Sequence, residues 1–224
     1  MQTIRWGEIP YIEATHRQLE LVESLAAQEE SSSGAEGFLC FCTHPPVVTM
    51  GRATRPGDVF GWTGERIETS RGGRATYHGP NQIVVYPILN LRYSRESFSA
   101  RDVHGYLRAL EISVVETLKE FGISAEIRSA GNGPDEASLT GVWASGRKLA
   151  SIGIAVKKWI TYHGLALNVE ADSRAFSGIR PCGFDAEIMT SMEDLLGAPV
   201  DRGAVEATLE KHLRSLCHSS MMSL

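Results

Sequence analysis

Three apolar runs separated by short turns constrain the fold of this chain more than any other feature. They are Leu139–Ala144, Lys148–Val156 and Trp159–Val169. Each has the length and composition of a β-strand, and the short connections are typical of strands that follow one another in a sheet. The sequence therefore predicts a β-meander over residues 139–169.

Helical periodicity appears on both sides of this region. Between residues 100 and 121, apolar residues recur with the spacing of a long amphipathic helix, which Gly122 is expected to end. Ile12–Ala27 has similar spacing, and a last helix is expected over about Arg202–Cys217. Residues Thr190–Glu193 have the spacing of a capping box before a short helix.

The order of these elements indicates the fold class. Further strands are expected at Gly37–Thr43, Arg66–Thr69 and Ile83–Leu89, and polar loops at residues 28–37 and 129–138. Helices and strands do not alternate strictly, which favours an α+β fold over a doubly wound sheet. We expect a mixed, largely antiparallel sheet flanked by helices. No change in composition marks a linker, so residues 1–224 are expected to form a single domain. A small C-terminal lobe that begins at about Arg180 is the alternative.

Charge and composition exclude several classes of protein. The chain has 22 Lys and Arg against 27 Asp and Glu, a net charge of −5, which argues against nucleic-acid binding. Its apolar runs are too short to span a bilayer, and its first residues resemble neither a secretory signal nor a transit peptide. Four cysteines in 224 residues do not make a disulfide framework. We expect a cytoplasmic protein with reduced thiols that acts on neither nucleic acid nor membranes.

The cysteines fall into two groups. Cys40 and Cys42 alternate within an apolar run, so they share one face of a strand and are expected in the core, and Cys217 is expected to fill space on the last helix. Cys182 lies between Pro181 and Gly183, which places its thiol on a constrained loop, as exposed nucleophiles often are. A catalytic thiol needs a nearby cation to be ionised at neutral pH, so a lysine or arginine is expected beside it.

Two further segments combine glycine with basic residues. In Arg71–His78, adjacent glycines let the backbone approach a ligand, and successive N–H groups can form a nest for an anion or carbonyl. The alternative is a glycine turn with a solvated basic rim. In Gly146–Gly153, Lys148 lies between a tight turn and a strand of small residues, so it can project into a pocket. The alternative is an ordinary exposed turn lysine.

The tetrapeptide TYHG occurs twice, at Thr76–Gly79 and Thr161–Gly164, which is too short to indicate a duplication. A metal site built on His78 and His163 would need further ligands, and no suitably spaced Cys or carboxylate lies near either residue. We therefore expect no metal.

Several blocks, taken in order, carry a resemblance to a known family. They are THPPVVTMGR (43–52), RGGRATYHGPNQIVVYPILNL (71–91), TGVWASGRKLASIGI (140–154), YHGLALNV (162–169) and PCGF (181–184). The chain resembles the lipoyl(octanoyl) transferase family, whose fold is shared with lipoate and biotin protein ligases. One departure is Asn81, where the family usually has glycine; Asn tolerates a left-handed φ better than most residues.

The resemblance implies roles for particular residues. Cys182 is implied to be the nucleophile that carries the acyl group as a thioester, with Lys148 as its partner in a dyad. The implied substrate-binding residues are Arg71, Gly72, Gly73, Arg74, Ala75, Thr76, Tyr77, His78, Ala150, Ser151, Ile152, His163, Gly164 and Leu165.

The implied reaction moves an octanoyl group from octanoyl-acyl carrier protein to a lysine ε-amine. The acceptors are implied to be the lipoyl domains of 2-oxoacid dehydrogenases and the H protein of glycine cleavage, and neither ATP nor another cofactor is implied. Two alternatives remain: an ATP-dependent lipoate or biotin ligase of the same fold, and a non-catalytic acyl-binding or scaffold protein. The cysteine after Pro181 argues against the first, and the intact pair of Cys182 and Lys148 argues against the second.

The charge is unevenly distributed along the chain. Residues 71–95 and 141–168 each contain four basic residues and no acidic one, so together they carry +8 and leave −13 for the rest. Because both segments are assigned to the site, a basic mouth is expected there. Such a mouth would steer acidic carrier proteins and lipoyl domains toward the site.

Overall fold

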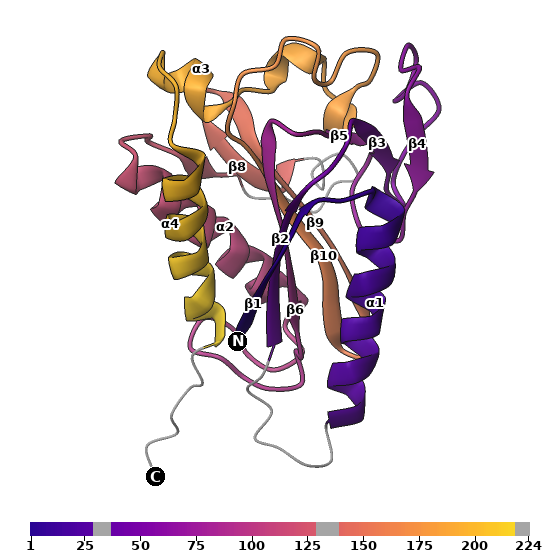
Figure 1. Ribbon diagram of the computed structural model, residues 1–224, viewed down its shortest axis with the longest axis vertical. Helices are drawn as coiled ribbons and strands as arrows, with labels where there is room; N and C mark the ends of the chain where they lie inside the picture. The colour runs from indigo at the N-terminus through magenta and orange to yellow at the C-terminus, as the bar shows by residue number, and fades with distance from the viewer. Residues whose placement is uncertain (29–36, 129–138, 218–224) are drawn as a thin grey trace.

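The computed structural model describes residues 1–28, 37–128 and 139–217. Its centre is a seven-stranded sheet with the order β1-β2-β6-β10-β9-β8-β7 (Figure 1). Only β1 and β2 pair in parallel; every other neighbouring pair of this sheet is antiparallel. The expected mixed, largely antiparallel sheet is thus confirmed. Its strands are β1 (Gln2–Glu8), β2 (Gly37–Thr43), β6 (Gln82–Leu89), β7 (Glu126–Ile127), β8 (Gly141–Ala144), β9 (Arg147–Lys157) and β10 (Ile160–Asn168).

The predicted meander is confirmed as β8, β9 and β10, which are successive neighbours in the sheet. Two residues with positive φ separate each pair of strands: Ser145 and Gly146 in the first turn, Lys158 and Trp159 in the second. Tight hairpin turns of this kind match the twist of the flanking strands. The first turn places Lys148 near the start of β9.

Helices cover both faces of the large sheet (Figure 1). On one face, α2 (Val103–Glu120) and α4 (Arg202–Arg214) pack over Ile83 and Val85 of β6. On the other, α1 (Tyr11–Ala27) packs over Val84 and Tyr86. Strand β6 is therefore buried along its whole length. Cys40 and Cys42 lie in the core beneath α1, as predicted.

A smaller sheet lies beside the N-terminal end of α1 (Figure 1). It has the order β4-β3-β5, with β3 parallel to β4 and antiparallel to β5. The strands are β3 (Val47–Met50), β4 (Glu65–Glu68) and β5 (Thr76–His78). Of these, only β4 was expected from the sequence. The glycine-rich segment Arg71–His78, which was assigned to the site, follows β4 and ends with β5.

Most helix ends agree with the sequence. Gly122 follows α2 with φ of 76°, and the helical turn Ser215–Cys217 continues α4 to the predicted end. The capping box was predicted one residue too early: Ser191, not Thr190, caps α3 (Met192–Leu196), with Asp194 as its partner. The reason is that the Thr190 amide donates to the carbonyl of Lys148 at 3.0 Å, which ties Thr190 to β9.

Three further expectations concern the polar loops, the turn at Asn81 and the crossing of a membrane. The predicted loops at 28–37 and 129–138 lie almost entirely outside the described residues. Asn81 is not among the residues with positive φ, so its turn requires no left-handed conformation. None of the helices in the described ranges combines the length and apolarity needed to cross a membrane.

Candidate active site

Folding brings Cys182 and Lys148 together, although 34 residues separate them in the chain. The Lys148 Nζ lies 3.2 Å from the Cys182 Sγ, within hydrogen-bond distance for sulfur. Lys148 is the second residue of β9, and Cys182 lies in the 3₁₀ turn Pro181–Gly183. The sequence predicted a cation beside this thiol, and the structure places one there.

The backbone presents the thiol in an unusual conformation. Cys182 has φ of 54° and ψ of 18°, a left-handed conformation that few residues other than glycine adopt. Its amide donates to the carbonyl of Ala75 at 2.9 Å, which fixes the turn against the glycine-rich segment, just before β5. Strained backbone held by its surroundings is common at functional sites.

Gly183 is required because the Arg74 guanidinium packs against it. Gly183 has φ of 88°, and a Cβ atom there would overlap that guanidinium. Arg74 in turn pairs with the carboxylate of Asp58, which is 1% exposed, through a 3.0 Å Nε–Oδ2 bond and a second contact from its terminal nitrogen. The Asp58 carbonyl also accepts from the Arg180 amide at 2.7 Å. Asp58 therefore links the glycine-rich segment to the turn Pro181–Gly183, which we call the cysteine turn.

The charge of Asp58 is stabilised by these contacts. Burial raises the pKa of Asp58, but hydrogen bonds from Arg74 and from the Arg55 amide outweigh burial, so the pKa lies below its ordinary value. Nothing in the sequence pattern singled out Asp58, because a lone aspartate in a turn is common.

Lys148 is buried, so the alternative of an exposed turn lysine is wrong. Only 1% of its surface is exposed, and its ammonium lies 5.6 Å from the centre of the Trp143 ring. Gly141 leaves room for the side chain: a Cβ there would lie 2.8 Å from Lys148 Cε. The Gly141 amide donates to the buried carboxylate of Glu111 at 2.9 Å, and burial raises the pKa of Glu111 despite that bond.

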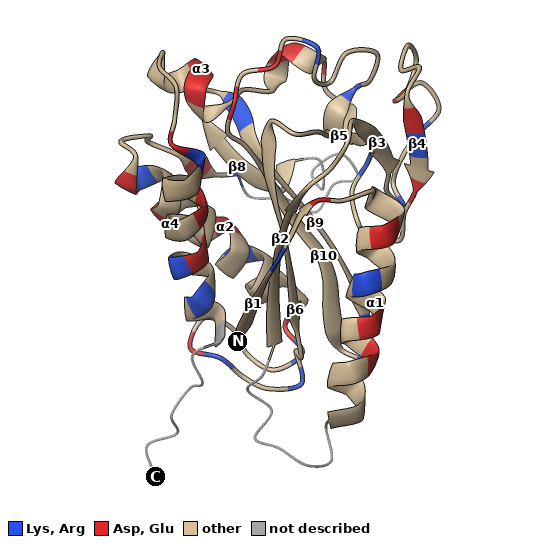
Figure 2. Ribbon diagram, in the orientation of Figure 1, with Lys and Arg blue, Asp and Glu red and all other residues tan. Residues whose placement is uncertain are grey.

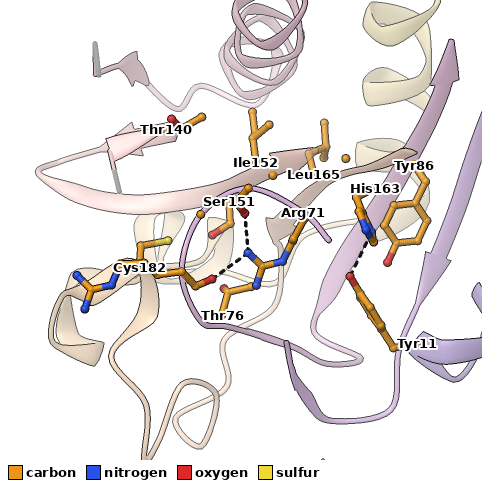
Figure 3. Close-up of a pocket in the computed structure, with 15 residues that line it drawn as sticks. Tyr11, Arg71, Thr76, Tyr86, Thr140, Ser151, Ile152, His163, Leu165 and Cys182 are labelled. Carbon is orange, nitrogen blue, oxygen red and sulfur yellow. Dashed lines mark hydrogen bonds between the residues drawn. The ribbon is translucent and has the colours of Figure 1, made fainter. Parts of the chain in front are cut away.

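Arg71 is also buried, which excludes a solvated basic rim at this residue. Its guanidinium donates to the carbonyls of Gly72, Arg74 and Thr49, and to the Thr49 hydroxyl, at 2.7–3.0 Å. The Gly72 amide donates to the Ile154 carbonyl of β9 at 3.0 Å. Arg71 thus organises the glycine-rich loop over β9 while still lining the cavity (Figure 3).

The cavity beside Cys182 measures about 470 Å³, including the part open to solvent. Most predicted site residues line it: Arg71, Gly72, Gly73, Arg74, Thr76, Ser151, Ile152, His163, Gly164, Leu165 and Cys182. The remaining predicted residues lie behind this lining: Lys148, Ala75, Tyr77, His78 and Ala150. Four lining residues were not predicted: Tyr11, Tyr86, Thr140 and Gly153.

The residues behind the lining support the site from the core. Tyr77 packs edge-on against Trp62 and Phe176, at 5.6 and 5.4 Å between ring centres, and Ala150 belongs to the core beneath α2. His78 is buried against the Tyr11 ring at 5.6 Å. Their predicted contact with substrate is untested and stays a prediction.

A cluster of neutral histidines and tyrosines lies at one side of the cavity, and of its members His163, Tyr11 and Tyr86 line the cavity. Burial lowers the pKa of His163 to about 3 and that of His44 to about 4, and it lowers the pKa of His78 well below its ordinary value. His44 lies 2.7 Å from both the Ile9 carbonyl and the Tyr86 hydroxyl. Within the described ranges, no three His, Cys, Asp or Glu side chains are grouped to hold a metal ion.

Four of the basic residues that led us to expect a basic mouth at the site are engaged in other contacts. Arg71 is bonded to backbone carbonyls, and Arg74 pairs with Asp58. Lys157 and Lys158 both pair with Glu23 of α1, at 2.9 and 2.7 Å. Charges of both signs are distributed along α1 and α4 (Figure 2).

Comparisons with known proteins agree with this architecture. A lipoate-protein ligase A bound with ATP superimposes with a TM-score of 0.66 at 17% identity, covering 98% of this chain and 87% of that one. The biotin protein ligase from Aquifex aeolicus superimposes with a TM-score of 0.52 at 15% identity, covering 95% and 67%. The fold is therefore that of the lipoate and biotin protein ligases, as the resemblance implied.

Sequence similarity narrows the class to a family. The model of the lipoyl protein ligase A/B catalytic domain matches residues 14–214. A protein named octanoyltransferase from Bdellovibrio bacteriovorus is 47% identical over 213 residues, covering 93% of this chain and 94% of that protein. The chain belongs to the octanoyltransferase family, which shares the lipoyl protein ligase A/B catalytic domain.

Proposed function

We propose that this protein transfers an octanoyl group from octanoyl-acyl carrier protein to a lysine ε-amine of lipoyl domains, through a thioester on Cys182. The observation that carries the proposal is the 3.2 Å contact between the Lys148 ammonium and the Cys182 sulfur, beside a cavity whose lining includes Ile152 and Leu165. The name of the 47% identical relative, octanoyltransferase, supports the acyl group chosen.

In the first half-reaction, Lys148 stabilises Cys182 as a thiolate. The thiolate attacks the carbonyl carbon of the octanoyl thioester, the new S–C bond forms, and the bond to the carrier's sulfur breaks. The departing carrier thiolate takes a proton from Lys148, which is left neutral. The amides of Cys182 and Gly183 already donate to the carbonyls of Ala75 and Arg180, so other donors must stabilise the oxyanion.

In the second half-reaction, the lysine amine of the lipoyl domain attacks the acyl-enzyme. A C–N bond forms, the C–S bond breaks, and the proton lost by the amine passes to the neutral Lys148. The ammonium–thiolate pair is thereby restored. Because a thioester is converted to an amide, the exchange runs downhill without ATP, and no metal or other cofactor takes part.

The apolar part of the cavity supplies binding energy for the acyl chain. Ile152 and Leu165, which pair across β9 and β10, both line it. At about 0.8 kcal/mol per buried methylene, the seven carbons beyond the carbonyl contribute roughly 5–6 kcal/mol. This energy holds the thioester carbonyl beside Cys182 while the thiolate attacks.

Transfer between purified proteins tests the proposal. The enzyme is incubated with octanoyl-acyl carrier protein and a lipoyl domain, without ATP, and the mass of the lipoyl domain is measured. We expect one octanoyl adduct, absent from a lipoyl domain whose acceptor lysine is replaced by arginine. Transfer that requires ATP and free octanoate would instead identify a ligase, and no transfer under either condition would favour a non-catalytic protein.

A further inference from the structure

Tyr11 and His163, which are hydrogen-bonded to each other, line the side of the cavity that lies away from Cys182 (Figure 3). The Tyr11 hydroxyl lies 3.3 Å from His163 Nδ1, and the Ser70 hydroxyl lies 3.2 Å from His163 Nε2. The Tyr162 hydroxyl lies 2.8 Å from that of Ser70. We call Tyr11, His163 and Ser70 the end wall.

A second cavity lies behind the end wall. It measures about 660 Å³, including the part open to solvent, and Tyr11 and His163 line both cavities. Its other lining residues are Ile12, Thr15, His16, Ile67, Glu68, Thr69 and Ser70. Two side chains therefore separate the site beside Cys182 from a further space that includes two isoleucines.

The end wall is held rigidly. His163 has φ of 59° inside strand β10, and its amide donates to the buried Gln18 side chain of α1 at 2.7 Å. Tyr11 is stacked between the rings of His78 and His163, at 5.6 and 6.3 Å between ring centres. A neutral imidazole has one donor and one acceptor nitrogen, so His163 can bond both neighbouring hydroxyls at once.

Apolar burial alone cannot reject a chain that is too long. Each added methylene strengthens binding by about fourfold where space is available, so an open-ended cavity would favour longer chains. Discrimination against them requires a rigid obstacle at a fixed place. The end wall is such an obstacle, because interiors resist overpacking.

We propose that Tyr11 and His163 set the maximum acyl length by closing the cavity, and that the space behind them accepts longer saturated chains once the wall is opened. This inference rests on the proposed function, because it assigns the length limit of the same acyl group. It makes Tyr11 and His163 specificity-determining residues of the site.

Competitive loading tests the inference. Wild-type enzyme and the variants Tyr11→Ala and His163→Gly are each incubated with an equimolar mixture of acyl carrier proteins bearing C8, C10, C12 and C14 chains. Intact mass then gives the ratio of acyl groups on the enzyme. We expect C8 to dominate in the wild type, and the C12-to-C8 ratio to rise at least tenfold in both variants.

Two control variants separate the wall from its surroundings. Tyr11→Phe keeps the ring and should leave the ratio within twofold of wild type. Ile12→Ala enlarges only the cavity behind the wall and should do the same. Should Tyr11→Ala fail to fold, His163→Gly decides, since glycine adopts a φ of 59° without strain.

The outcomes are distinct. A C12-to-C8 ratio unchanged in folded Tyr11→Ala and His163→Gly would overturn the inference, as would loss of all loading in both. A ratio that rises equally in Ile12→Ala would also overturn it, because the wall would not be the barrier. If the wild type itself carries no acyl group on Cys182, the proposed function fails, which is a different result.

Discussion

Lys148 is the single charged side chain on which the proposed chemistry depends most. With its ammonium 3.2 Å from the sulfur, Lys148→Ala should slow alkylation of Cys182 by iodoacetamide near pH 7 by about tenfold or more, because the thiolate loses its neighbouring cation. Lys157→Ala is the matched control, since Lys157 pairs with Glu23 at the surface. An alkylation rate that is equal in Lys148→Ala and wild type would count against the dyad.

Gly183 offers a second test at the scale of one residue. Gly183→Ala forces a methyl group into the Arg74 guanidinium and should slow acyl loading by more than tenfold. Gly197→Ala is the control: Gly197 also has a positive φ, 67°, but its added methyl would meet nothing within 4 Å. Normal loading kinetics in Gly183→Ala would show that the cysteine turn tolerates displacement.

At the scale of elements, periodicity in the sequence predicted the long helices and the meander. It missed β1, β3, β5 and β7, which are short or largely exposed and carry little pattern of their own. These strands form because a neighbouring strand is present, for example when β1 pairs with β2. Such pairing is a property of the folded chain, so no local pattern indicates it.

The site was predicted unevenly for a similar reason. Cys182 and Lys148 lie in two of the sequence blocks that carry the family resemblance, so the sequence could indicate them. Tyr11 reaches the cavity only because α1 packs against β10, and in the sequence it is an ordinary aromatic residue at the start of a helix. Asp58 likewise has a role at the site only because folding pairs it with Arg74.

The ion pair between Asp58 and Arg74, which joins two loops, gives a prediction at the scale of elements. Asp58→Asn removes a carboxylate that is 1% exposed and leaves Arg74 without its anion, so unfolding free energy should fall by roughly 3 kcal/mol. Acyl loading should slow as well. Glu206→Gln is the control, because Glu206 pairs with Arg5 in a contact largely open to water and should cost under about 1 kcal/mol. Urea unfolding measures the free energy of unfolding of both variants. Equal losses of free energy in the two variants would contradict a stabilising role for Asp58.

For the whole molecule, the buried neutral histidines predict how stability depends on pH. His44 and His163 have pKa values of about 4 and 3, below the ordinary 6.5, so the unfolded chain binds more protons between those values. Stability should therefore fall as pH drops below 6.5, with each histidine contributing at most about 1.4 kcal/mol per pH unit.

Thermal melting from pH 7.5 to 5.0 checks this dependence. Asp58 and Glu210 contribute little over this range, because their pKa values are lowered below the ordinary 3.8 and 4.5. Glu111, whose pKa is raised by burial, acts in the opposite direction to the histidines. His163→Gly should make the fall in melting temperature shallower, whereas replacement of the exposed His104 by Gln should leave it as steep as in wild type. A melting temperature that is constant over this range would contradict neutral buried histidines.

The most direct test of the account locates the acyl group on the enzyme. After incubation with octanoyl-acyl carrier protein, the protein is denatured, digested and analysed by mass spectrometry. Cys40 and Cys42 serve as internal controls, because both are buried and burial raises the pKa of Cys40 to about 12. The account predicts one octanoyl group, on Cys182, and none in Cys182→Ala. An octanoyl group on any other residue, or loading that persists in Cys182→Ala, would contradict it.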